Sequence, residues 1–244
     1  MGSLAKSRLG TRAQPEQSRA AILKAAVTEF AREGVAGART DAIARSAGVN
    51  KALLYYYFKD KEGLYQAVLD EVFSGVRIAI QNALGEDLPP RERLTAYVRA
   101  HFDYIASKPL FPRIVQAELL RSYRSPAGIQ RLSKRYFRPI FAQLSALLEE
   151  GIRLREFRPV NVMHFTPLMV SVIVSYFITA APVITIVTGA DPYAPELIAD
   201  RRAAVLDFIS AALFVPQSSG KRPLPAGEAP SPHAAPSTKK GDRR

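Results

Sequence analysis

Residues 40–58, TDAIARSAGVNKALLYYYF, decide the fold of this chain, because they have the pattern of two short helices joined by a tight turn. Thr40 is of a residue type that caps helices, and Ile43, one turn later, is expected to face inward. Gly48 stands where the turn needs a left-handed backbone, which glycine adopts without strain. The stretch therefore predicts a helix-turn-helix, a motif whose second helix enters the major groove of DNA, although short helical hairpins in proteins that do not bind DNA can have the same spacing.

The second helix of this motif is expected over 50–57. Asn50 would cap it, and Ala44 in the first helix is small enough for the second helix to cross closely. Leu54 and Tyr57 are three residues apart and would hold the second helix onto its neighbours. The residues left for its outer faces are Lys51, Ala52, Leu53, Tyr55 and Tyr56.

The rest of the chain is helical by period, without alternating stretches long enough to suggest a sheet. Pro15 would open the first helix and Gly34 would end it. Ser125 followed by Pro126 has the pattern of a cap and a first helical residue, opening a helix that Pro139 should kink. The other predicted helices cover 61–84, 91–107, 112–122, 125–151, 161–188 and 195–214.

The string at 47–64, AGVNKALLYYYFKDKEGL, resembles the signature of the tetracycline-repressor (TetR) family nearly residue for residue. The resemblance covers about 16–68, and the upstream matches are Ile22, Ala25, Ala26, Phe30 and Gly34. It implies an all-α protein with an N-terminal three-helix helix-turn-helix DNA-binding domain and a larger helical ligand-binding and dimerisation domain. It also implies repression that a small molecule relieves. The sequence departs from the family at Arg39, Thr40 and Leu53, so operator sequence does not transfer.

With this resemblance the chain divides into four parts. Residues 1–14 form a basic arm that is expected to be disordered, and 15–68 form the DNA-binding domain. Residues 69–214 form the regulatory and dimerisation domain. Residues 215–244 are rich in Pro, Ser, Lys and Arg with few large apolar side chains, and are expected to be a disordered basic tail.

Two groups of residues are expected to contact an inverted-repeat operator in double-stranded DNA. Lys51 can donate to guanine edges and Tyr55 can pack on a thymine methyl group. The expected base readers are Arg45, Lys51, Ala52 and Tyr55, and the expected phosphate contacts are Arg39, Thr40, Asn50, Tyr56, Lys59 and Lys61. The alternative for the tyrosines is amphipathic packing, and for the lysines a solvated charged turn.

Residues 159–190 contain no Asp, Glu, Lys or Arg, which raises a helical membrane-associated protein as the first alternative. Pro167 and Pro182 leave a segment between them that is shorter than the ~20 residues a bilayer needs. A helix that is apolar on every side must otherwise be buried against its own domain and a partner. Residues 161–188 and 195–214 are therefore expected to form a homodimer interface, without a membrane partner.

Aromatic residues gather in the middle of the chain, and some are expected to line a cavity for an unknown small-molecule effector. A cavity with few polar anchors favours an apolar or amphipathic ligand, although core packing explains most aromatic residues equally well. The candidates are Phe102, Phe111, Tyr123, Phe137, Phe141, Phe165, Met169 and Tyr176.

Composition narrows the function further. The formal net charge of +12 is concentrated towards the two ends of the chain, where it could meet a polyanion. The absence of cysteine excludes disulfides and thiolate catalysis, and a cytoplasmic location is expected. The chain has no nucleophile-elbow, P-loop or dinucleotide motif, and His101, His164 and His233 lack a ligand pattern. We expect no cofactor, no metal and no enzyme, with a cofactor-free helical enzyme as the weaker alternative.

Overall fold

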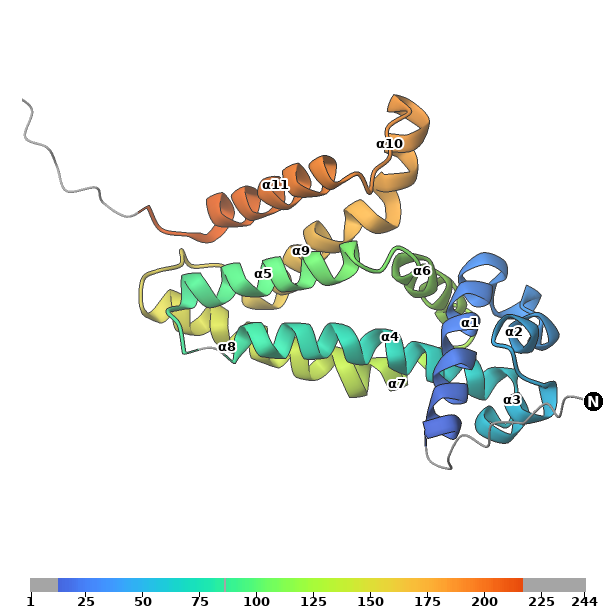
Figure 1. Cartoon of the computed structure of the whole chain (residues 1–244). Helices are drawn as coiled ribbons and strands as arrows, with labels where there is room; N and C mark the ends of the chain where they lie inside the picture. Colours follow the sequence, from blue (N-terminus) through green and yellow to red (C-terminus); the bar gives the residue numbers. More distant parts are fainter. Residues whose placement is uncertain (1–12, 86, 217–244) are drawn as a thin grey trace, which may run out of the picture.

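The computed structural model describes residues 13–85 and 87–216, and this part of the chain is helical without β-strands (Figure 1). This confirms the all-α class. The expectations for 1–12 and 217–244 lie outside the described residues. The helices are α1 (Ala13–Gly37), α2 (Thr40–Ser46), α3 (Lys51–Phe58), α4 (Lys61–Leu84), α5 (Pro90–Ala106), α6 (Phe111–Ser122), α7 (Ala127–Leu132), α8 (Arg138–Arg153), α9 (Val162–Ser175), α10 (Ala181–Thr188) and α11 (Pro195–Leu213).

Helices α1, α2 and α3 pack together at the N-terminal end of the molecule (Figure 1). Their shared core includes Ile22, Phe30, Ile43 and Leu54, none more than 1% exposed. Gly34 breaks α1, as predicted, with a φ of +66°, but a further helical turn continues to Gly37. Helix α1 also begins at Ala13, before the predicted start at Pro15.

Helix α4 joins this N-terminal unit to the rest of the molecule. It has the predicted bounds, Lys61–Leu84, and packs against α1 at one end and against α5 and α8 further along (Figure 1). The expected domain boundary at residue 68 therefore falls inside one continuous helix. A movement of α4 would therefore displace helices on both sides of that boundary.

The predicted long helix 125–151 is divided into α7, a π-helical segment (Ser133–Phe137) and α8. Ser125 does not cap it, because the capping position is Pro126 and no side chain bonds there. The wide turn ends at Arg138, whose N–H donates to Ser133, directly before Pro139. Proline lacks the N–H that an α-helix needs, so the π-helical turn takes the place of the expected kink.

A second π-helical segment (Tyr176–Ala180) lies between α9 and α10 and has the same cause. The N–H of Ala181 donates to Tyr176, and Pro182 follows. The predicted helix 161–188 is thus interrupted near its middle.

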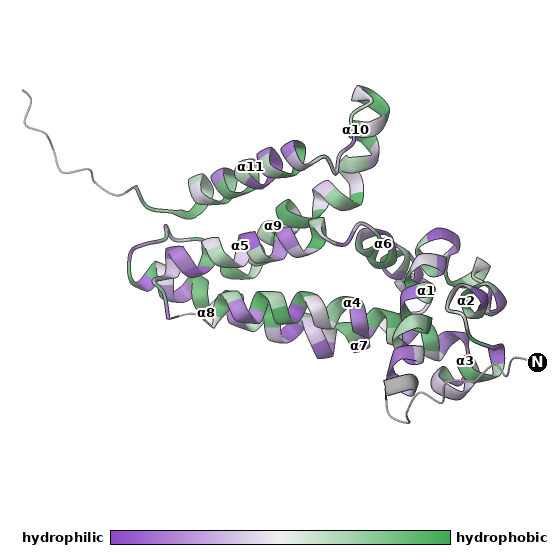
Figure 2. Ribbon diagram, viewed as in Figure 1, coloured by the Kyte–Doolittle hydropathy of each residue, from purple (hydrophilic) through white to green (hydrophobic). Residues whose placement is uncertain are grey.

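The segment Val162–Thr188 is long and apolar enough to cross a membrane by length and composition alone, and little of it is buried in the monomer. Figure 2 shows that apolar colour continues onto α10, which projects from the body of the molecule. The exposed large apolar side chains here and on α11 are Met163, Leu168, Val183, Ile186, Val187 and Phe208.

Val215, which was expected to lie in the disordered tail, is hydrogen-bonded to the body of the protein. The N–H of Val215 donates to Glu156 over 2.9 Å, and Arg91 donates to the Val215 carbonyl. Phe214 stacks on Phe157 with ring centroids 5.5 Å apart. These contacts fix the end of α11 against the loop before α9.

Candidate DNA-binding surface and ligand cavity

The turn between α2 and α3 is built as the sequence predicts. Gly48 has a φ of +68°. The N–H of Val49 donates to Ala44 over 3.0 Å, and the N–H of Gly48 donates to Arg45 over 3.2 Å. This pair of bonds is the Schellman arrangement that ends a helix on a left-handed residue. It fixes the direction in which the chain enters α3.

Helix α3 is anchored at both ends. The side chain of Asn50 accepts a hydrogen bond of 2.8 Å from the N–H of Leu53, as the predicted cap requires. Leu54 and Phe58 are buried, whereas Tyr57 is only half-buried. The opposite face of α3 is therefore left to solvent.

The four expected base readers, Arg45, Lys51, Ala52 and Tyr55, are all exposed. Lys51 is held by Asp41 of α2 through an ion pair of 2.8 Å, and its ammonium lies 5.9 Å from the centre of the Tyr55 ring. The hydrogen bond between the two groups raises the pKa of Lys51 and lowers the pKa of Asp41. A lysine that reads a base must exchange this partner for a guanine edge.

The expected phosphate contacts are placed less uniformly. Arg39, Asn50, Tyr56 and Lys59 are exposed, and Tyr56 is 80% exposed. Thr40 is the first residue of α2 rather than its cap, because Arg39 takes the capping position. Its buried hydroxyl lies 3.2 Å from the hydroxyl of Tyr55, so it ties α2 to α3.

Lys61 also has a role inside the protein. Its ammonium donates to the carbonyl oxygens of Ala36 and Ala38 over 3.1 and 3.2 Å. These carbonyls follow the break in α1, so Lys61 joins the start of α4 to the end of α1. Lys61 stays a predicted phosphate contact, and a DNA phosphate would have to compete with these two carbonyl oxygens for its ammonium.

Sequence reasoning missed two residues of this region. Asp41 was not recognised as the partner of Lys51, although an acidic residue in the first turn of α2 was visible. Gly63 was also missed. A Cβ at Gly63 would lie under 3.0 Å from the carbonyl oxygen of Phe58, closer than real Cβ atoms approach a neighbour. The glycine lets α4 begin directly beside the end of α3.

A cavity of about 370 Å³ lies among helices α4, α5, α6, α8 and α9. Three of the residues predicted for a ligand pocket, Phe111, Phe137 and Phe141, line it. Within 13–85 and 87–216, no Asp, Glu, Lys or Arg lines it. The lining residues are Phe73, Val76, Ile80, Tyr97, His101, Ile105, Phe111, Pro112, Val115, Leu119, Tyr136, Phe137, Ile140, Phe141, Leu144, Thr166, Pro167, Val170, Ser171, Val174 and Ile178.

The other five candidates do not line this cavity. Phe102 is fully buried against Phe177, with ring centroids 5.0 Å apart. Tyr123 is 88% exposed at the end of α6. The remaining three, Phe165, Met169 and Tyr176, pack with the core beside the cavity.

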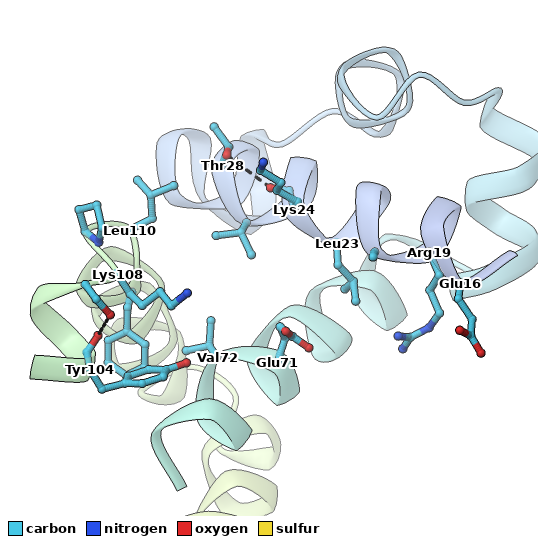
Figure 3. A pocket seen from close by; sticks show the side chains of 15 residues that line it. Glu16, Arg19, Leu23, Lys24, Thr28, Glu71, Val72, Tyr104, Lys108 and Leu110 are labelled. Carbon is cyan, nitrogen blue, oxygen red and sulfur yellow. Dashed lines mark hydrogen bonds between the residues drawn. The ribbon is translucent and has the colours of Figure 1, made fainter. Parts of the chain in front are cut away.

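A second hollow, of about 540 Å³, lies between the N-terminal unit and the rest of the molecule (Figure 3). Side chains of both signs line it, among them Arg19 and Lys24 from α1, Glu71 from α4 and Lys108 before α6. Phe111 lines both this hollow and the apolar cavity. One aromatic residue therefore lies between the apolar cavity and the junction with α1.

Comparison with known proteins identifies the class. The family model described as "Bacterial regulatory proteins, tetR family" matches residues 22–68, and the model described as "Tetracyclin repressor-like, C-terminal domain" matches 90–209. The HTH-type transcriptional regulator RutR of Escherichia coli strain K12 is 30% identical over 170 residues, which is 70% of this chain and 78% of RutR.

Two further relatives agree. The HTH-type transcriptional repressor NicS of Pseudomonas putida is 35% identical over 112 residues, covering 46% of this chain and 53% of NicS. The crystal structure of the transcriptional regulator SCO4942 from Streptomyces coelicolor superposes with a TM-score of 0.62 at 25% identity, covering 80% of this chain and 98% of that one. The chain belongs to the TetR family of bacterial transcriptional regulators and is a DNA-binding regulator. This membership favours neither the membrane-protein nor the enzyme alternative.

Proposed function

We propose that the chain is a cytoplasmic repressor that binds an inverted-repeat operator as a homodimer and leaves it when an apolar or amphipathic small molecule occupies the cavity. The observation that carries the DNA-binding part is α3, a capped helix with a buried inner face and exposed Lys51, Ala52, Tyr55 and Tyr56. Two-fold symmetry of a dimer is mirrored by two-fold symmetry in its DNA site.

A second copy of the chain is the proposed cover for the exposed apolar side chains of α9, α10 and α11. Ile186 is 83% exposed and Val187 is 75% exposed. Contiguous apolar surface of this kind marks an interaction site in soluble proteins. The same helices were expected to form the interface from the uncharged sequence at 159–190.

Helix α6 is the proposed link between ligand and DNA. One of its faces lines the cavity through Phe111, Pro112, Val115 and Leu119. From elsewhere on α6, Arg121 donates to Glu62 at the start of α4 over 2.8 Å.

Helix α6 also packs on α1 of the DNA-binding unit. A ligand that displaces α6 would therefore shift α1 and the start of α4, and with them the spacing of the two recognition helices in the dimer.

The DNA-reading part is tested with Lys51→Ala, assayed by fluorescence anisotropy on a selected operator and on a scrambled duplex. If Lys51 donates to a base edge, the operator affinity falls roughly five- to a hundredfold, and the scrambled duplex loses much less. The matched variant Asp41→Asn frees Lys51 and removes a negative charge near the phosphates, so it should tighten binding to both duplexes. An unchanged ratio of operator to scrambled binding in Lys51→Ala, with the helix content intact, would remove Lys51 from the readers.

A further inference from the structure

Among the residues that the structure describes, the lining of the cavity between α4, α5, α6, α8 and α9 has no formally charged side chain. The histidine in it, His101, is 7% exposed, and burial lowers its pKa to about 4. The imidazole is therefore neutral at physiological pH. Nothing in this lining can balance the charge of an ionised ligand.

The apolar lining is interrupted by polar side chains, of which Tyr136 and Ser171 already donate to Asp70 and to the Pro167 carbonyl. The other polar groups lie on two adjacent helices, α5 and α9. On α5, the phenol of Tyr97 lies 3.1 Å from Nδ1 of His101. When the phenol donates to Nδ1, the neutral ring carries its proton on Nε2 and has one donor left. On α9, Thr166 is fully buried, and its hydroxyl makes no hydrogen bond to any described residue.

An unpaired buried hydroxyl is unusual in a folded protein and is a reason to look for a missing partner. Thr166 is one of the residues that line the cavity, so a ligand that packs against it can supply that partner once the fully buried side chain turns towards the cavity. A neutral oxygen atom gains a hydrogen bond there. An ionised carboxylate or ammonium group would lose its water without meeting a counter-ion, a cost of several kcal/mol per ion.

We infer that the cavity binds a small uncharged hydrophobic molecule that carries one hydrogen-bonding oxygen, an alcohol or a ketone, placed against Thr166 and His101. The inference names the effector class of the proposed function and rests on it. A volume of about 370 Å³ lies at the lower end of the range for small-molecule pockets, which suits a compact ligand. The inferred site would bind neutral oxygen-containing hydrophobic molecules in preference to fatty acids and alkylamines of the same length.

The charge discrimination is tested on the full chain by isothermal titration at pH 7.5 with four probes of equal length: 1-nonanol, 2-nonanone, nonanoate and nonylammonium. The two neutral probes should bind, and the two ions should bind at least tenfold more weakly. Binding of nonanoate or nonylammonium as tight as that of 1-nonanol would overturn the inference. So would a protein that takes up none of the four.

The polar anchor is tested with Thr166→Val, which removes the hydroxyl at nearly constant volume, and with Thr166→Ser, which keeps it. Affinity for 1-nonanol should fall about three- to tenfold in Thr166→Val and be retained in Thr166→Ser. Butylbenzene, which has no oxygen, should bind Thr166→Val and the unchanged protein alike.

A purely structural role for Thr166 predicts a different effect on stability. It would lower the melting temperature of ligand-free Thr166→Val, whereas an unpaired hydroxyl has no bond to lose, and its removal should not lower that temperature. If Thr166→Val loses the same affinity for 1-nonanol as for butylbenzene, or loses affinity for neither, Thr166 is not the hydrogen-bonding anchor.

The inference and the proposed function fail separately. Uptake of the neutral probes by a protein that shows no operator binding would refute the regulatory proposal and leave the cavity chemistry standing. Tight operator binding by a protein that binds nonanoate or nonylammonium instead of the neutral probes would refute the cavity chemistry and leave the regulatory proposal standing. Release of a labelled operator by 1-nonanol, lost in Thr166→Val at the same probe concentration, would support both.

Discussion

Gly63, in the first turn of α4, is packed so closely that it leaves no room for the methyl group of an alanine. Helix propensity alone favours Gly63→Ala by up to about 1 kcal/mol, because alanine is the better helix former. The new Cβ would press on the carbonyl oxygen of Phe58, which is backbone and cannot rotate away. It would also lie 3.3 Å from the Asp60 oxygen that caps α4 through the N–H of Gly63. Overpacking of this kind costs about 1 to 3 kcal/mol, and a lost cap about 1 kcal/mol more.

The net expectation for Gly63→Ala is a loss of about 1 to 3 kcal/mol in the free energy of unfolding, measured by urea titration followed by circular dichroism. Operator affinity should fall as well, because the end of α3 has to move. Gly37→Ala is the matched control, since the nearest neighbour of its Cβ is the Glu33 Cβ at 3.4 Å, an ordinary contact. It should be neutral or stabilising. If Gly63→Ala is as stable as Gly37→Ala and binds DNA normally, the steric reasoning is refuted.

Three further outcomes are expected. Lys59→Ala should lower the salt dependence of DNA binding by about one counterion without changing the urea midpoint of unfolding. Lys61→Ala loses two partly exposed hydrogen bonds to carbonyl oxygens and should lower the free energy of unfolding by about 1 kcal/mol. Equal effects of the two variants on stability would count against a structural role for Lys61. Phe208→Glu, on exposed α11, should give a folded monomer by light scattering, and a persistent dimer would exclude this surface from the interface. Because burial lowers the folded-state pKa of His101 to about 4, the unfolded chain binds the proton first, so this contribution to stability is complete above pH 6.5 and about 3 kcal/mol of it is lost as the pH falls from 6.5 to 4. His101→Gln should flatten that slope in pH-dependent urea titrations, and an unchanged slope would count against the burial of a neutral imidazole.

The elements that local chemistry determines could be predicted from sequence. Gly48 and Asn50 act through their own backbone and their near neighbours, so the turn and the cap of α3 follow from residue type. The bounds of α4 follow from Asp60 at its start and Gly85 at its end in the same way. Pro139 predicted a disturbance, although its form, a π-helical turn, depends on how the flanking helices pack.

Contacts between distant residues could not be predicted. Lys61 meets carbonyl groups more than twenty positions earlier in the chain, and no local pattern shows that α1 ends beside the start of α4. The cavity posed the same difficulty. Phe102 and Phe111 are both aromatic and both on the inner side of their helices, yet only Phe111 lines the cavity, because Phe177 fills the space beside Phe102. Thr166 is not aromatic, so the clustering of aromatic residues in the sequence did not point to it as a cavity residue.

Sequence-specific binding of DNA by a dimer can be measured by selecting bound duplexes from a random pool and footprinting the full chain on the enriched sequence. We expect an enriched inverted repeat, with two related half-sites protected by one dimer. Enrichment of a single asymmetric site would contradict the dimer as the binding unit. A pool that shows no enrichment, from folded protein at low salt, would contradict the assignment of α3 as a sequence-reading helix.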